Sequence, residues 1–167
     1  DSLRPWIASL QLAVAPVIRA GYDPQSGVEV VLKARAQAAG KPVSGLETID
    51  QQVRILATLS EETQLAFLRL TLQSFDDATT DLDALVDAWA QGDVEGINRL
   101  AVEEMRTVSP EIHEALLVRR NVDWADQIQT LLAGSGTTFI AVGSAHLAGD
   151  DSVQQILEDR GVTVTRQ

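Results

Sequence analysis

Residues 137–149, which read TTFIAVGSAHLAG, decide the predicted fold of this chain. The apolar run 139–142 is short, rich in β-forming residues and preceded by the glycine-rich turn 134–136. Such a run predicts a buried strand of an α/β sheet. Gly143 ends the run, and His146 follows three residues later, where a strand-to-helix loop is expected. Ligands and catalytic groups gather at that edge of open α/β sheets, so we expect the functional site here.

The rest of the sequence predicts mostly helices. Apolar side chains recur every three or four positions, which is typical of amphipathic helices. Asp150 and Asp151 stand where the N-cap of the last helix belongs. The predicted helices cover about residues 3–20, 26–40, 49–56, 60–72, 82–92, 94–105, 111–118, 121–132 and 150–160.

Strands are too few for a complete sheet of this type. Only the runs 43–47, 137–142 and 162–165 have β-strand character, whereas such sheets average about 5–6 strands. We therefore expect a helix-rich α/β fold with a partial mixed sheet, whose N-terminal strands belong to a segment that this chain lacks. The alternative from pattern alone is a small α-rich domain with a minor sheet.

Composition excludes several classes of protein. Hydrophobic residues make up 45% of the 167 residues, which excludes a disordered tail, and no apolar run approaches the ~20 residues that span a bilayer. The 24 acidic and 13 basic residues give a net charge of −11, which disfavours nucleic-acid binding. The absence of cysteine excludes disulfides and thiolate metal sites. The first residues do not have the pattern of a signal peptide.

Four stretches together resemble the TraB/GumN/PrgY family, whose animal relatives are the Tiki proteases. They are GKPVSGLET at 40–48, RNVDWA at 120–125, FIAVGSAHL at 139–147 and GVTV at 161–164. The family has two G-x-x-H motifs, and this chain has only the second, from Gly143 to His146, because His113 lacks the glycine. The resemblance therefore implies that residues 1–167 are the C-terminal portion of a single domain, with a helical insertion at about 60–118.

The same resemblance implies a core similar to the erythromycin-esterase and haem-binding ChaN-like folds, and a metal-dependent, peptidase-like hydrolase. It assigns catalysis to Glu47, Arg120, Asn121 and His146, with Glu47 and His146 also ligating a divalent transition metal. We expect the site to need the missing N-terminal segment, and the chain to bind metal weakly or not at all by itself. The implied substrate is a peptide or a small molecule, and the implied location is the bacterial cell envelope or periplasm.

A purely structural interpretation competes with the functional one for His146, Glu47 and Asn121. His146 fits a buried structural histidine as well as a metal ligand or general base, with Gly143 letting the backbone approach the site closely. Glu47 fits a carboxylate stabilised by the start of the next helix. Asn121 fits a helix cap, and Arg120 fits an oxyanion stabiliser at the positive end of a helix.

A non-catalytic module is the competing functional hypothesis. A haem-binding, ChaN-like protein would use His146 as an axial ligand, and a regulatory module would sequester a peptide without cleaving it. A structural or interaction protein is the third possibility. Ser144 is not a candidate nucleophile, because the sequence has no G-x-S-x-G elbow around it.

Overall fold

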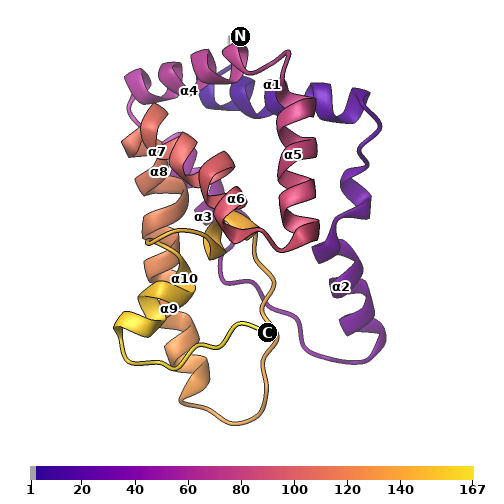
Figure 1. Cartoon of the computed structure of the whole chain (residues 1–167), viewed down its shortest axis with the longest axis vertical. Coiled ribbons are helices and arrows are strands. Elements are labelled where there is room, and N and C mark those ends of the chain that lie inside the picture. The colour runs from indigo at the N-terminus through magenta and orange to yellow at the C-terminus, as the bar shows by residue number, and fades with distance from the viewer. Residues whose placement is uncertain (1–2) are drawn as a thin grey trace. The chain divides into compact units, whose positions relative to one another are not determined.

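The structure is a computed structural model that describes residues 3–167 (Figure 1). The chain forms two compact units, Asp1–Thr79 and Thr80–Gln167. Helices make up most of both units, and no residue of the described part belongs to a β-strand. The same part of the chain contains no helix with the length and apolar character needed to cross a membrane.

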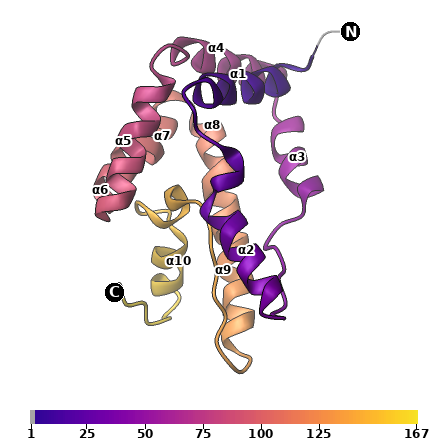
Figure 2. The same cartoon turned by 90° about the vertical axis from the view of Figure 1, so that its right-hand side faces the viewer.

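Side chains cap the starts of two helices of the first unit, α3 and α4. Thr48 and Gln51 form a reciprocal capping box at the start of α3, and the Ser60 side chain accepts from the backbone N–H of Thr63 at the start of α4. Helices α1 and α4 lie side by side in both Figure 1 and Figure 2. The helices of this unit are α1 (Pro5–Arg19), the 3₁₀ turn η1 (Pro24–Ser26), α2 (Val28–Ala38), α3 (Ile49–Ala57) and α4 (Glu61–Gln73).

The second unit contains two long helical runs, each with a π-helical segment inside it. These π segments, in which backbone hydrogen bonds span five residues, are rare and often mark functional sites. The first run is α6 (Val94–Ile97), η2 (Asn98–Glu103, π) and α7 (Glu104–Val108). The second is α8 (Pro110–His113), η3 (Glu114–Val118, π) and α9 (Arg119–Leu132).

The remaining elements of the second unit are α5 (Ala78–Gln91), which begins two residues before the unit boundary, the 3₁₀ turn η4 (Ser144–Leu147) and α10 (Val153–Asp159). Helix α10 packs along α9 (Figure 2). The Arg160–Asp126 ion pair, with Nη1 and Oδ1 2.6 Å apart, joins the end of α10 to α9.

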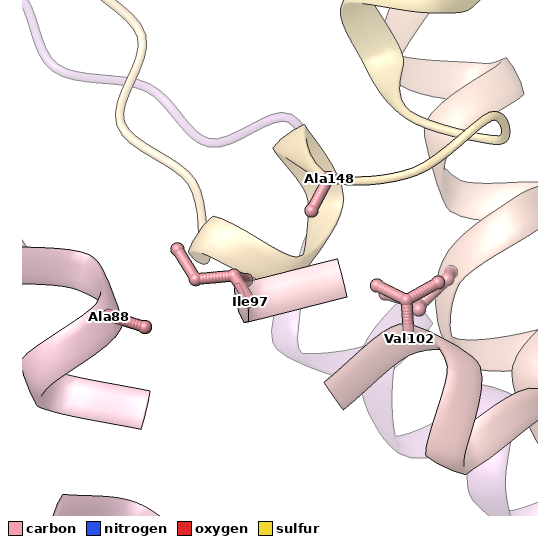
Figure 3. Close-up of a cluster of buried hydrophobic side chains, with 5 residues drawn as sticks. Ala88, Ile97, Val102 and Ala148 are labelled. Atoms are coloured by element: carbon pink, nitrogen blue, oxygen red, sulfur yellow. The ribbon is translucent and has the colours of Figure 1, made fainter. Parts of the chain in front are cut away.

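A small apolar core fixes the turn η4 against both long helical runs. Its buried residues are Ala88, Ile97, Val102, Leu117 and Ala148 (Figure 3). Ala148 directly follows η4, while Val102 and Leu117 come from the two π segments. The chain next to His146 is therefore held by packing against the two long helical runs.

The prediction of an α/β fold with a partial mixed sheet is wrong. None of the runs 43–47, 137–142 and 162–165 forms a strand in the part of the chain that the structure describes. Phe139, expected in a buried strand, is 77% exposed. A β-forming run becomes a strand only when its backbone groups pair with a neighbouring strand, and propensity alone supplies no such partner.

The helix predictions are confirmed, with two corrections that affect the site. The helices expected at 111–118 and 121–132 form one continuous run, so Arg120 and Asn121 lie inside a helical rod and not at its start. The N-cap of α10 is Ser152, whose Oγ accepts from Gln155 N at 3.4 Å, and not Asp150 or Asp151. The description of residues 60–118 as an insertion into a larger domain stays a prediction.

Candidate functional site

His146 is a buried histidine, 7% exposed, in the turn η4. Its backbone N–H donates to Gly143 O at 3.0 Å, so the G-x-x-H spacing closes a single 3₁₀ turn. A Cβ added at Gly143 would meet only ordinary van der Waals contact, with His146 Cδ2 at 3.7 Å, and the φ of Gly143 is −59°. The described residues thus leave room for a side chain at position 143, and the close backbone approach to the site stays a prediction.

Both ring nitrogens of His146 make hydrogen bonds with side chains of α9. Nδ1 lies 2.6 Å from Asn121 Oδ1, and Nε2 lies 3.2 Å from Arg120 Nη1. A guanidinium can only donate, so Nε2 accepts, and the proton of a neutral ring sits on Nδ1 and is donated to Asn121. The hydrogen-bond network thus assigns His146 as a neutral imidazole in the Nδ1–H tautomer.

Asn121 orients that imidazole and is itself oriented by the backbone. Its side chain is 1% exposed, and its Nδ2 donates to the carbonyl oxygen of Asp151 at 2.7 Å. With the amide nitrogen used in this way, Oδ1 is the end that faces His146. Asn121 is therefore not the helix cap considered from sequence, because it links α9 to the turn before α10.

Arg120 and His146 share the indole of Trp124 as a neighbour. The Arg120 Cζ lies 4.8 Å from the Trp124 ring centroid, and the Trp124 and His146 ring centroids are 4.3 Å apart at 43°. Arg120 Nη1 also donates to Leu116 O at 2.9 Å, which ties the guanidinium to the π segment η3. A desolvated cation–π contact contributes about 0.5–2 kcal/mol. Trp124 was not predicted as a site residue, although its position four residues after Arg120 places both on one helix face.

The four predicted site residues are divided between the two units. Arg120, Asn121 and His146 form one hydrogen-bonded cluster in the second unit, which we call the His146 cluster and to which Trp124 also belongs. Glu47 lies in the first unit, immediately before the capping residue of α3, and its carboxylate accepts from Gln52 Nε2 at 3.4 Å.

The residues of the cluster do not by themselves complete a metal centre, and the predicted metal binding stays a prediction. Catalytic metal sites usually have three protein ligands, and residues 3–167 contain no group of three His, Cys, Asp or Glu side chains placed to hold an ion. The unprotonated nitrogen of His146 faces the guanidinium of Arg120, and a metal bound to that nitrogen would be repelled by this positive charge.

The neighbourhood of Asp151 was not predicted from the sequence. Its Oδ2 accepts from Arg106 Nη2 at 2.9 Å and lies 3.7 Å from Nε2 of the buried His113. Arg106 is 45 residues away in sequence, and no spacing pattern indicates a contact over that distance.

Comparison with known proteins agrees with the resemblance seen in the motifs. The chain is 25% identical over 167 residues to an uncharacterized protein of Treponema pallidum (strain Nichols), covering 93% of this chain and 50% of that protein. It is also 25% identical over 152 residues to the uncharacterized protein YbaP of Escherichia coli (strain K12), covering 91% of this chain and 55% of YbaP. The chain thus spans about half the length of these curated relatives, and no solved structure matches it.

A sequence model of one family, described as the TraB/PrgY/gumN family, matches residues 1–166. This match includes the 143–146 motif and both neighbours of His146 on α9. The chain therefore belongs to the TraB/PrgY/gumN family.

Proposed function

We propose that this protein is a hydrolase acting on peptides, and that the His146 cluster is its acid–base centre. One observation carries the proposal: the buried imidazole of His146 is fixed through Nδ1 by Asn121, while the lone pair of Nε2 accepts from the guanidinium of Arg120 and becomes available as a base when Arg120 moves away. A histidine oriented through one nitrogen and basic at the other is the arrangement that general-base catalysis requires. The relationship to Tiki proteases, which the motifs indicate, supports a peptide as the substrate.

The proposed reaction assigns one role to each residue. His146 Nε2 takes a proton from water as the water oxygen attacks the peptide carbonyl carbon, and the imidazolium then gives that proton to the leaving amine. Arg120 moves from Nε2 to the carbonyl oxygen, where its positive charge stabilises the oxyanion. Asn121 keeps the ring in place by accepting from Nδ1–H throughout.

Metal dependence is a separate part of the hypothesis, with Glu47 and His146 as the ligands that the resemblance implies. Because the described residues do not by themselves complete a metal centre, the steps above use none. Haem ligation would use the His146 nitrogen that accepts from Arg120, so it too would require Arg120 to move away from Nε2. Nothing in the His146 cluster favours the haem-binding alternative.

The test is hydrolysis of a peptide library, read by mass spectrometry, with variants at neighbouring positions. We expect His146→Ala to lower the rate about 10²–10⁴-fold and Arg120→Gln about 10²–10³-fold. The matched control is Arg119→Gln, because Arg119 is 71% exposed and pairs with Glu114 at the surface. This variant should keep the wild-type rate.

Two results contradict the proposal. Wild-type rates in His146→Ala would remove the histidine from the chemistry. If the wild-type protein binds library peptides without cleaving them, the sequestering module is favoured instead. Mutating Arg120 would then change the affinity for these peptides, with no hydrolysis to measure.

A further inference from the structure

We infer that Asp151 is a positioning residue for the His146 base and that Arg106 holds it in place. The inference rests on the proposed function, because it assumes that His146 is the base. Asp151 lies in the turn between η4 and α10. It acts through Asn121.

Asp151 uses its backbone and its side chain in two different directions. The backbone carbonyl accepts from Asn121 Nδ2 at 2.7 Å. The carboxylate Oδ2 accepts from Arg106 Nη2 at 2.9 Å, and His113 Nε2 is 3.7 Å from the same oxygen. One residue therefore connects α7 to the side chain that orients the catalytic imidazole.

The carbonyl of Asp151 decides which end of the Asn121 amide faces His146. A side-chain amide is nearly symmetric in shape, with an acceptor at one end and a donor at the other. If the amide rotated by half a turn, Nδ2 would face His146 and force the ring proton onto Nε2. Nε2 would then face the donors of Arg120 with a proton of its own, so the base would be lost. A fixed acceptor at Asp151 prevents this rotation.

The carboxylate anchors the turn that presents this carbonyl. The turn is closed by Ser152 N donating to Gly149 O at 3.2 Å, and Arg106 ties it to α7. The side chains of Arg106 and Asp151 are 37% and 38% exposed. Such ion pairs contribute little to overall stability, so losing this one should leave the fold intact and change the local position of the carbonyl.

The experiment measures the imidazole ¹⁵N resonances of His146 at a fixed pH where the ring is neutral. Asp151→Asn keeps the backbone carbonyl and the side-chain shape but removes the charge, and Arg106→Gln removes the partner while leaving Asp151 intact. The control is Asp126→Asn, which breaks the Arg160–Asp126 pair on the same helix as Asn121.

We expect well-separated Nδ1–H and unprotonated Nε2 resonances in the wild type and in Asp126→Asn. In Asp151→Asn and Arg106→Gln the two resonances should move toward each other as the other tautomer is populated, and kcat should fall on the order of tenfold with KM unchanged. Arg106→Lys keeps the charge, so it should restore most of the separation between the two resonances and most of kcat.

Unchanged His146 resonances in Asp151→Asn and Arg106→Gln overturn the inference, whatever the activity. If Asp151→Asn does not fold, Arg106→Gln decides alone. The proposed function fails in a different way: the wild-type protein then hydrolyses no peptide, while the tautomer in Asp151→Asn still shifts if Asp151 positions the ring.

Discussion

Replacement of Asn121 by alanine is the most direct test of the His146 cluster. The side chain is 1% exposed and makes two hydrogen bonds, one with His146 Nδ1 at 2.6 Å and one with the Asp151 carbonyl at 2.7 Å. Asn121→Ala leaves that donor and that acceptor without their partner. Each buried polar group left in this way costs about 1–3 kcal/mol, so for two groups we expect a total loss of about 2–6 kcal/mol.

The loss can be measured by urea unfolding followed by far-ultraviolet circular dichroism. The midpoint should fall without a change in slope, since the compactness of neither state changes. In a thermal scan, a loss of this size corresponds to roughly 4–24 °C for a chain of this length. The control is Asp123→Ala, an exposed position on the same helix, where we expect a change within about 0.5 kcal/mol.

The result that would refute this reasoning is a loss of less than about 0.5 kcal/mol in Asn121→Ala, equal to that of the control. It would mean that the amide is not buried between His146 and Asp151. Asn121→Asp gives a second reading. It keeps an acceptor for His146 but cannot donate to the Asp151 carbonyl, and it places a charge at a buried position, so it should also be destabilised.

Three further predictions concern the glycines and the metal. Gly149→Ala should cost about 2–3 kcal/mol of stability, because the φ is +79° and the new Cβ would lie 2.5 Å from Asn98 Oδ1. The control Gly136→Ala, with a φ of +94° and open space around the new Cβ, should cost only about 1 kcal/mol. Equal losses of stability in thermal melts would contradict this prediction. Gly143→Ala should change stability by less than about 1 kcal/mol in the same melts, and a larger loss would restore its steric role. Titration with Co²⁺, followed by visible absorption, should reveal no tight stoichiometric site. A tight Co²⁺ site that His146→Ala abolishes would show that the described residues do form a metal centre.

The helices could be predicted from sequence because their signals are local. Helical spacing of apolar residues and a capping serine at position 60 are both visible within a few residues of the element they define. The strand at 137–142 could not be judged in the same way. Its residues favour extended backbone, but a strand also needs a neighbouring strand to pair with, and the described part of the chain contains none.

The site shows the same division between local and distant information. His146 was identifiable from its motif, and Arg120 and Asn121 from the family resemblance, but their contacts with His146 span 26 and 25 residues. Hydrophobic periodicity carries no information at that separation. Asp151 was predicted only as a candidate helix cap. Its contact with Arg106 could not be predicted, because no sequence pattern links two residues that lie 45 positions apart.

The π segment Glu114–Val118 has a consequence for how this family can tolerate changes in length. Successive residues of an α-helix are turned by about 100° around its axis. A π segment accommodates one residue more than an α-helix over the same stretch. Deleting one residue here would therefore let the run return to α geometry while Arg120, Asn121 and Trp124 keep the face that meets His146. A deletion in the α-helical part after Val118 has no such extra residue to absorb it, and the side chains beyond it would turn by about that angle.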